Sequence, residues 1–379
     1  MKKLFFFGIL GLILFEIANV FFIMPMPGSQ RMNSIDLAYF LYRWRWAFRV
    51  LFAVMIIVGL LRANWKRKWV PAVALLPLLG IAYMFNFVMS ADHMFYQPSH
   101  LIMKTSAENK TDTARVIIGV TNNGEAKAYP VQYIGYHHQV MDTVGGKPLI
   151  ITYCTVCRTG RVYEPLVNGQ PETFRLVGMD HFNAMFEDKS TGSWWRQVNG
   201  EAIAGKMKGT FLPTVLHTQT SLKTWLSLYP DSYIMQPDPD FVAGYDSTFK
   251  YESGKSKSSL TGTDSLSWKD KSWVVGVKNG ANAKAYDWNM LKEKRLIQDI
   301  VGQDSLLLLL ANDDRSFFVF RKPMGASVEF LNDTLKINGK NFRLDGKGID
   351  TTAQLQRVLA SQEFWHSWKT FYPETKIYE

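Results

Sequence analysis

The sequence predicts an α+β protein in which a β-rich, internally duplicated domain follows an N-terminal bundle of three transmembrane helices. Three observations support this fold class. Three long apolar runs lie within the first 90 of the 379 residues. A hairpin-like sequence near residue 116 occurs again near residue 274. Elsewhere, apolar and polar residues alternate between glycine-rich turns, which is typical of strands.

These observations divide the chain into four parts. The boundaries are residues 1–90 for the three transmembrane helices, 91–245 for the first repeat, 246–269 for a linker or loop, and 270–379 for a second, degenerate repeat.

The three apolar runs are Leu4–Met24, Ala47–Leu61 and Trp69–Met89. The first and third have roughly the 20 residues that a helix needs to cross about 30 Å of hydrocarbon. The second is shorter, and we expect it to extend backward through Leu37–Trp46. The first run ends in Met-Pro-Met-Pro rather than in a small-residue cleavage site, so we interpret it as a retained anchor and not as a signal peptide.

The distribution of charge predicts the orientation of these helices. Residues 1–90 hold 10 Lys/Arg and 2 Asp/Glu, whereas the rest of the chain holds 33 and 31. Because Lys2, Lys3 and the basic loop 62–68 flank the runs, the positive-inside rule assigns them to the cytoplasm. We therefore expect a membrane-anchored protein with the large domain outside the cytoplasm, which for a bacterial inner membrane is the periplasmic side. Its partners would be the lipid bilayer and a membrane protein. The nearly neutral large domain argues against nucleic-acid binding.

The duplication follows from two pairs of similar segments. Val116–Tyr129 and Val274–Tyr286 each read as strand, Asn-Gly turn and strand, which predicts a hairpin. Leu222–Ser232 and Trp365–Thr375 each read as a short amphipathic helix that ends at Tyr-Pro. The two copies therefore match near their beginnings and at their ends.

The chain's two cysteines, Cys154 and Cys157, form a Cys-x-x-Cys motif in the first copy. The corresponding stretch of the second copy, Leu310–Ser316, has no cysteine. Because the second copy does without the pair, we interpret it as serving a local function. The flanking residues predict a strand–turn–strand knuckle, which favours a metal site over a redox helix.

A metal site would need further ligands, and His137, His181 and Met185 are the candidates. Two thiolates with an imidazole and a thioether would suit copper, which is our first choice of cofactor, and zinc is the alternative. The expected function is metal handling or electron transfer. A thiol–disulfide redox protein, or a structural subunit of a membrane complex with an inert disulfide, are the other hypotheses. The sequence assigns no catalytic residue.

The first copy resembles the DUF3179 family of bacterial proteins, which implies no known activity. The resemblance is clear over residues 90–236 and faint over the second copy. It rests on the following segments: Ala128–Pro130, His137, Asp142, Ile151–Cys157, Met185, Thr191–Trp194 and Gln197.

This sequence departs from the family pattern at three places. Thr155 follows the first cysteine, where a proline is frequent. His181 stands in a stretch where relatives tend to have Asn or Ser before Asp. The three N-terminal spans are not a feature that we associate with all members.

Overall fold

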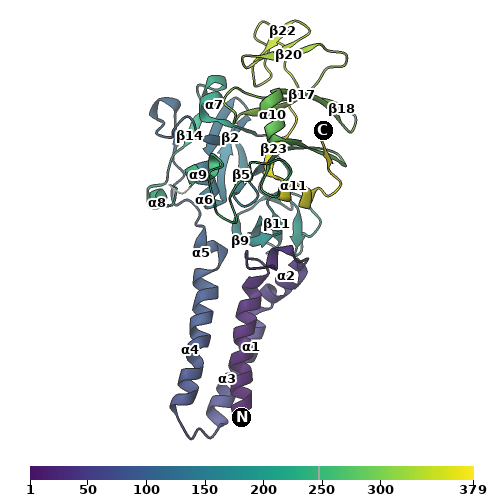
Figure 1. Ribbon diagram of the computed structural model, residues 1–379. Coiled ribbons are helices and arrows are strands. Elements are labelled where there is room, and N and C mark those ends of the chain that lie inside the picture. Colours follow the sequence, from purple (N-terminus) through teal and green to yellow (C-terminus); the bar gives the residue numbers. More distant parts are fainter. Residues whose placement is uncertain (246–247) are drawn as a thin grey trace. The chain divides into compact units, whose positions relative to one another are not determined.

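The computed structural model shows a mixed helical and β-stranded protein with several small sheets (Figure 1). It describes residues 1–245 and 248–379, so the first two residues of the expected linker, Asp246 and Ser247, lie outside the described part.

The chain forms two compact units, which we describe one at a time. Unit 1 joins the N-terminal helices to an excursion from the middle of the chain, and unit 2 holds the remainder. The ranges are 1–96, 172–196 and 201–211 for unit 1, and 97–171, 197–200 and 212–379 for unit 2.

Unit 1 begins with apolar helices that could anchor the chain in a membrane. Within the described residues, Lys2–Phe21 and Trp69–Val88 are each 20 residues long and apolar enough to cross a bilayer. The helices α2 (Ile35–Arg43) and α3 (Arg45–Arg62) meet at a bend of 60° and would make a third span only if counted as one. The remaining helices of this part are α1 (Lys2–Phe21), η1 (Ser29–Arg31), α4 (Trp69–Tyr83), the π-helix η2 (Met84–Val88) and α5 (Ala91–Met94).

A close helix contact and a polar cluster hold these helices together. A Cβ added to Gly59 of α3 would lie 2.5 Å from the backbone nitrogen of Phe5 in α1, so this contact requires a glycine. Deeper in the bundle, the buried Glu16 carboxylate accepts two hydrogen bonds from Arg49, at 2.7 and 2.9 Å. Asn86 donates a third at 2.9 Å, so the charge of Glu16 is paired within the apolar bundle.

Unit 1 also contains a four-stranded antiparallel sheet in the order β12-β11-β10-β9. Asp188, at the end of β10, holds the following turn because its carboxylate accepts hydrogen bonds from the Thr191 and Ser193 amides and from the Trp195 indole. The strands are β9 (Phe174–Asp180), β10 (Asn183–Asp188), β11 (Trp194–Arg196) and β12 (Ala202–Ala204).

Unit 2 starts with a run of strands and helices that contains both cysteines. Its strands belong to a five-stranded sheet, β1-β14-β3-β2-β13, and a three-stranded sheet, β4-β5-β6, whose apolar faces share one hydrophobic core. The elements in chain order are β1 (Met103–Lys104), β2 (Val116–Asn122), β3 (Glu125–Pro130), α6 (Val131–His137), β4 (Gln139–Val144), β5 (Lys147–Cys154), β6 (Thr159–Tyr163), β13 (Thr218–Ser221), α7 (Leu222–Leu228) and β14 (Tyr233–Met235).

A second run in unit 2 follows the same order of elements as the first run has from β2 onward. It has a four-stranded sheet, β23-β15-β16-β24, and a three-stranded sheet, β17-β18-β19. The elements are β15 (Trp273–Asn279), β16 (Asn282–Asp287), α10 (Trp288–Lys294), β17 (Leu296–Val301), β18 (Asp304–Leu310), β19 (Phe317–Arg321), β23 (Ala360–Phe364), α11 (Trp365–Phe371) and β24 (Lys376–Ile377).

Matching side chains make matching contacts in the two runs. A Cβ on Gly119 of β2 would lie 2.2 Å from the Trp225 ring of α7, and one on Gly276 of β15 would lie 2.2 Å from the Trp368 ring of α11. In each run, therefore, a glycine leaves room for a tryptophan ring to pack on the strand, which is β2 for the α7 ring and β15 for the α11 ring.

Two tyrosine–aspartate hydrogen bonds also correspond. The Tyr129 hydroxyl donates to Asp142 at 2.7 Å in the first run, and the Tyr286 hydroxyl donates to Asp299 at 2.8 Å in the second. These bonds tie the larger sheet of each run to its three-stranded sheet.

Short elements complete unit 2. The segment expected to be a linker contributes α9, from which Tyr251 is buried against the first run. The short elements are η3 (Ser106–Glu108), β7 (Leu166–Val167), β8 (Gln170–Pro171), η4 (Pro239–Phe241), α8 (Val242–Tyr245), α9 (Thr248–Glu252), β20 (Val328–Leu331), β21 (Thr334–Ile337) and β22 (Lys340–Phe342).

Candidate functional site

The Cys-x-x-Cys motif lies at the hairpin between β5 and β6. Cys154 is the last residue of β5 and pairs across the ladder with Thr159, and Cys157 lies in the four-residue turn between them. The turn closes through Arg158, whose φ of 56° is left-handed. The motif is therefore a strand–turn–strand knuckle, as the sequence indicates, and not the start of a helix.

Both cysteine side chains are fully buried, and the two sulfurs are not joined in a disulfide. The third hypothesis from the sequence, an inert disulfide, therefore does not describe this conformation. Burial of both thiols also limits direct attack by another protein's thiol, because thiol–disulfide exchange needs access to a sulfur.

Lys271 lies over the knuckle turn. Its Nζ donates to the carbonyl oxygen of Val156, between the two cysteines, at 3.1 Å, and to the carbonyl of Leu260 at 2.5 Å. Burial lowers the pKa of Lys271, and negative charge on Cys157 and Cys154 opposes this shift. The ammonium group therefore lies at the turn between the two cysteines, where its positive charge would favour the thiolate form.

The second run supplies another wall of the site through β23 and the start of α11. The Phe364 amide donates to the Cys157 carbonyl at 2.9 Å, and the Phe364 ring lies 4.7 Å below the Lys271 ammonium. His366 Nε2 lies 3.1 Å from the Val156 carbonyl and 3.2 Å from Lys271 Nζ. Burial lowers the pKa of His366 to about 4, so this imidazole is neutral at pH 7.

Arg158 fixes the far end of the turn. Its guanidinium donates to the backbone carbonyls of Tyr251 and Glu252, at 3.2 and 3.0 Å, and lies 3.5 Å from the Trp273 ring centroid. The Tyr251 hydroxyl lies 3.1 Å from the hydroxyl of Tyr153, the residue before Cys154, and burial raises the pKa of Tyr251. The knuckle is thus enclosed by parts of the chain that are distant in sequence.

Gln197 is hydrogen-bonded to both strands that carry the knuckle. Its amide nitrogen donates to the Thr152 hydroxyl and to the Thr159 carbonyl, both at 3.0 Å. Gln197 therefore holds the two strands that carry the turn.

His137 lies at the end of α6 and is fully buried. Its Nε2 is 2.7 Å from the Tyr245 hydroxyl, and the rings of Tyr136 and Phe241 pack edge-on against the imidazole. In this conformation the imidazole is part of an aromatic cluster with a polar contact to tyrosine.

His181 and Met185, the other expected ligands, belong to unit 1, whereas the cysteines belong to unit 2. His181 is in the β9–β10 turn, where Nδ1 contacts Asp180 at 2.7 Å and Nε2 contacts Asn33 at 3.1 Å. The hydrogen bond to Asp180 raises the pKa of His181. Met185 is fully buried in β10 opposite Gly178.

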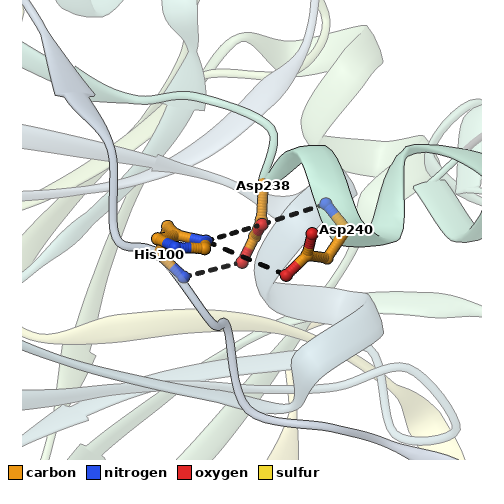
Figure 2. A group of neighbouring side chains, drawn as sticks. All are labelled: His100, Asp238 and Asp240. Carbon is orange, nitrogen blue, oxygen red and sulfur yellow. Dashed lines mark hydrogen bonds and ion pairs between the residues drawn. The ribbon is translucent and has the colours of Figure 1, made fainter.

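A different group of potential ligands comes together in unit 2. Among the described residues, only His100, Asp238 and Asp240 form a set of three or more His, Cys, Asp or Glu ligand atoms within 4.8 Å of one another (Figure 2). The Asp238 carboxylate, however, accepts backbone hydrogen bonds from His100 at 2.8 Å and Asp240 at 3.1 Å. This group is therefore explained as a cap that joins two loops.

The loop of the second run that corresponds to the knuckle shows what replaces the cysteines. Four residues again separate the strand partners, here Ala311 and Ser316, but the loop is organised by Asp313. The Asp313 carboxylate accepts hydrogen bonds from the Ser316 hydroxyl at 2.6 Å and from the Ser221 hydroxyl at 2.6 Å. A hairpin of this length is therefore stable without thiols.

The chain belongs to the DUF3179 family, described as proteins of unknown function, whose family model matches residues 98–375. The match covers both runs of unit 2, including the part where the resemblance read from the sequence is faint. Neither the curated proteins nor the solved structures contain a match.

Several residues of the family pattern have structural roles. Asp142 accepts from Tyr129, Gln197 holds the knuckle strands, and the Thr191–Trp194 segment wraps the Asp188 carboxylate. Lys271 and His366 were missed by the sequence reasoning because no motif marks them. Both side chains contact the Val156 carbonyl only because the folded chain brings these distant segments together.

Proposed function

We propose that this protein is a membrane-anchored protein of the bacterial inner membrane that binds a soft metal ion, most favourably copper(I), through Cys154 and Cys157. Its role would be metal handling or electron transfer on the periplasmic side. The observation that carries this proposal is the Lys271 ammonium bound to the carbonyl between the two cysteines.

The donor set favours a soft ion. Thiolates select copper(I) and zinc over magnesium or calcium, and both sulfurs lie in one short turn away from solvent. Burial gives a thiolate–metal bond a low-dielectric surrounding, where charge interactions are strong.

The charge balance favours copper(I) over zinc(II). Two thiolates with copper(I) carry one net negative charge, which the Lys271 ammonium neutralises. With zinc(II) the same two thiolates are neutral, and the ammonium would remain as an uncompensated charge in a buried place. Copper(I) also needs fewer ligands than zinc, whose structural sites have four.

The further ligands expected from the sequence remain part of the proposal. His137 would have to exchange its contact with Tyr245 for the metal, and Met185 or His181 would have to approach from unit 1. The minimal site therefore consists of the two sulfurs, and any third ligand is decided by the experiment below.

We further infer that the two runs of unit 2 arose by internal duplication and that only the first kept the site. The shared order of elements and the matching glycine–tryptophan contacts support this inference. The anchor would consist of three spans, with α2 and α3 forming the second across their bend. The basic loop at residues 62–68 would then face the cytoplasm.

Copper(I) binding by the full chain in detergent, under reducing and anaerobic conditions, tests the proposal. Competition with a chromophoric copper(I) chelator should show one copper per chain. Cys154→Ser and Cys157→Ser should each weaken binding by at least about 100-fold, since each removes a direct ligand. X-ray absorption at the copper edge would report two sulfur ligands, or additional nitrogen or thioether ligands.

Lys271→Met should weaken copper(I) binding by about tenfold and zinc(II) binding by less. Lys269→Met is the matched control, because Lys269 is exposed and lies two residues away. His137→Phe would leave the affinity unchanged at a two-sulfur site and reduce it at a three-ligand site. A chain that binds no copper, or that binds it equally after both serine substitutions, would refute the proposal.

A further inference from the structure

Unit 1 contains a cavity where the apolar helices meet the sheet. Its volume is about 420 Å³, which is within the roughly 300–1,000 Å³ typical of small-molecule sites. Its walls come from the end of α1, the α2–α3 bend, the end of η2 and strands β9 and β10. No residue of the Cys-x-x-Cys site lines it.

The polar lining has one cation that lacks an acidic partner. Arg175 pairs with Asp92 at 3.1 Å and Glu187 at 2.7 Å, and Arg49 pairs with Glu16. Arg45, in contrast, donates only to the Tyr42 carbonyl at 2.7 Å and has no carboxylate within 4 Å among the described residues.

The lining also has an acceptor without a donor. Asn19 is 7% exposed, and its Oδ1 has no hydrogen-bond partner among the described residues. Leaving such a group unpaired costs roughly 1–3 kcal/mol. Asn19 lines the cavity, so a ligand that offers an N–H or O–H group would satisfy this oxygen once the amide turns toward it.

The remaining lining mixes apolar residues with Tyr42, Asn86, Ser90 and His93. Its apolar part includes residues at the ends of the two 20-residue apolar helices, where these would leave the bilayer. Val20 and Ile23 line the cavity at the end of α1, and Phe85 and Met89 line it from η2 and the residue that follows η2. A ligand that matches all of these features combines an anion, a hydrogen-bond donor and a hydrocarbon part.

We propose that this cavity binds the headgroup of a phospholipid that carries a primary ammonium, such as phosphatidylethanolamine. The phosphate would lie at Arg45 and the ammonium would donate to Asn19, in a cavity that is also lined by the carboxylates of Asp92 and Glu187. The acyl chains would follow the apolar side of the helices. This inference rests on the membrane anchor of the proposed function and is independent of the metal site.

Retention of defined lipids by the full chain, measured by native mass spectrometry and by the shift of the unfolding temperature on lipid addition, tests this site. The probes are phosphatidylethanolamine and phosphatidylcholine with identical acyl chains, because choline has the same phosphate but no N–H group. We expect one phosphatidylethanolamine per chain, bound at least about tenfold more tightly than phosphatidylcholine.

Variants separate the two contacts. Asn19→Leu should reduce phosphatidylethanolamine binding to the phosphatidylcholine level, whereas Arg45→Met should weaken both lipids and Arg45→Lys should restore part of the binding. Arg43→Met is the matched control, since Arg43 is exposed, lies two residues before Arg45 at the end of α2, and does not line the cavity. Because Arg45 is only half-buried, its variants remain informative even if Asn19→Leu fails to fold.

Equal binding of the two lipids to the unaltered chain would overturn the proposal, and so would equal effects of Arg43→Met and Arg45→Met. Soluble glycerophosphoethanolamine is the third probe. If it binds as tightly as the lipid, the ligand is a soluble phosphodiester and the lipid assignment is wrong. Copper binding is expected to be unchanged in all of these variants, so failure here is distinguishable from failure of the proposed function.

Discussion

Buried imidazoles in unit 2 give the fold a dependence on pH. His217 donates through Nδ1 to the Val215 carbonyl at 2.9 Å, and burial lowers its pKa to about 4. His138, which follows α6 in a left-handed conformation, has its pKa lowered to about 4 for the same reason. Folding therefore requires these side chains to be neutral.

The consequence is acid sensitivity between pH 6.5 and 4. Because the folded pKa is below the unfolded value, the unfolded chain binds more protons in this range, so stability is full above pH 6.5 and declines as pH falls. The free energy of unfolding should fall between pH 6.5 and 5 in the unaltered chain. We expect this fall to be smaller by roughly 2 kcal/mol in His217→Gln. Denaturant unfolding at several pH values measures this, with the exposed His100→Gln as the control. Parallel pH profiles for His217→Gln and the unaltered chain would contradict the assignment.

At the residue scale, the sequence identified the cysteines by their spacing and by the absence of cysteine from the similar stretch Leu310–Ser316. It did not identify Lys271, because a single lysine after a serine- and glycine-rich segment carries no local signal. Its importance comes from the contact with Val156, which is 115 residues earlier in the chain.

At the scale of elements, the packing of α7 on β2 depends on a residue without a side chain. Gly119 leaves room for the Trp225 ring, and a methyl group there would overlap ring atoms at 2.2 Å. Because the Trp225 ring is buried within the cluster between α7 and β2, it cannot turn out into solvent to relieve the overlap.

We predict that Gly119→Ala destabilises unit 2 by roughly 3 kcal/mol, near the upper end of typical overpacking costs. In a Trp225→Leu background the same substitution should cost less than about 1 kcal/mol, because the clash is gone. Denaturant unfolding of the four chains in this double-mutant cycle gives the coupling energy. Gly276→Ala with Trp368→Leu repeats the test in the second run. Additive effects would show that ring overlap is not the cause.

The first hairpin of each run, the knuckle strands and the late helices could be predicted because hairpin sequences, Asn-Gly turns and Tyr-Pro helix ends are local signals. The β9–β12 sheet is different. The sequence assigned residues 172–211 to the first repeat without indicating that most of them pack in one unit with the N-terminal helices. Tertiary contacts decide this, and alternating patterns do not specify the partner of a strand's apolar face.

At the scale of the whole molecule, an ion pair joins the two runs of unit 2. Arg161 of β6 donates to the Glu363 carboxylate of β23, which also accepts from the hydroxyls of Ser361 at 3.0 Å and Ser367 at 2.9 Å. Both charged side chains are buried, so each depends on the other for compensation.

Removing one partner should therefore destabilise the pair of runs together. We expect Glu363→Ala to cost roughly 3–5 kcal/mol, because it leaves the Arg161 charge buried and unpaired. The exposed pair Lys336–Glu329 is the control, and Glu329→Ala should cost less than about 1 kcal/mol. Calorimetry should show both runs unfolding in one transition. Independent melting of the two runs would refute this coupling.

The proposed membrane topology also belongs to this scale. A cysteine placed at Lys66 should be protected from a membrane-impermeant maleimide in intact spheroplasts, whereas one at Lys257 should be labelled. After permeabilisation both should react, because both lysines are exposed. The unaltered chain is the control, since its own cysteines are buried. Labelling at position 66 in intact spheroplasts would reverse the orientation.

The sequence by itself determined the apolar N-terminal segments, the family, the two similar runs and the knuckle that carries Cys154 and Cys157, because each depends on periodicity or spacing along the chain. Only the tertiary structure decided what surrounds the sulfurs. Lys271, Phe364 and Tyr251 reach the knuckle from distant segments, and His137 contacts Tyr245 instead of a metal. Such neighbours follow from which apolar faces pack together, and that choice is a property of the whole folded chain and not of any one segment.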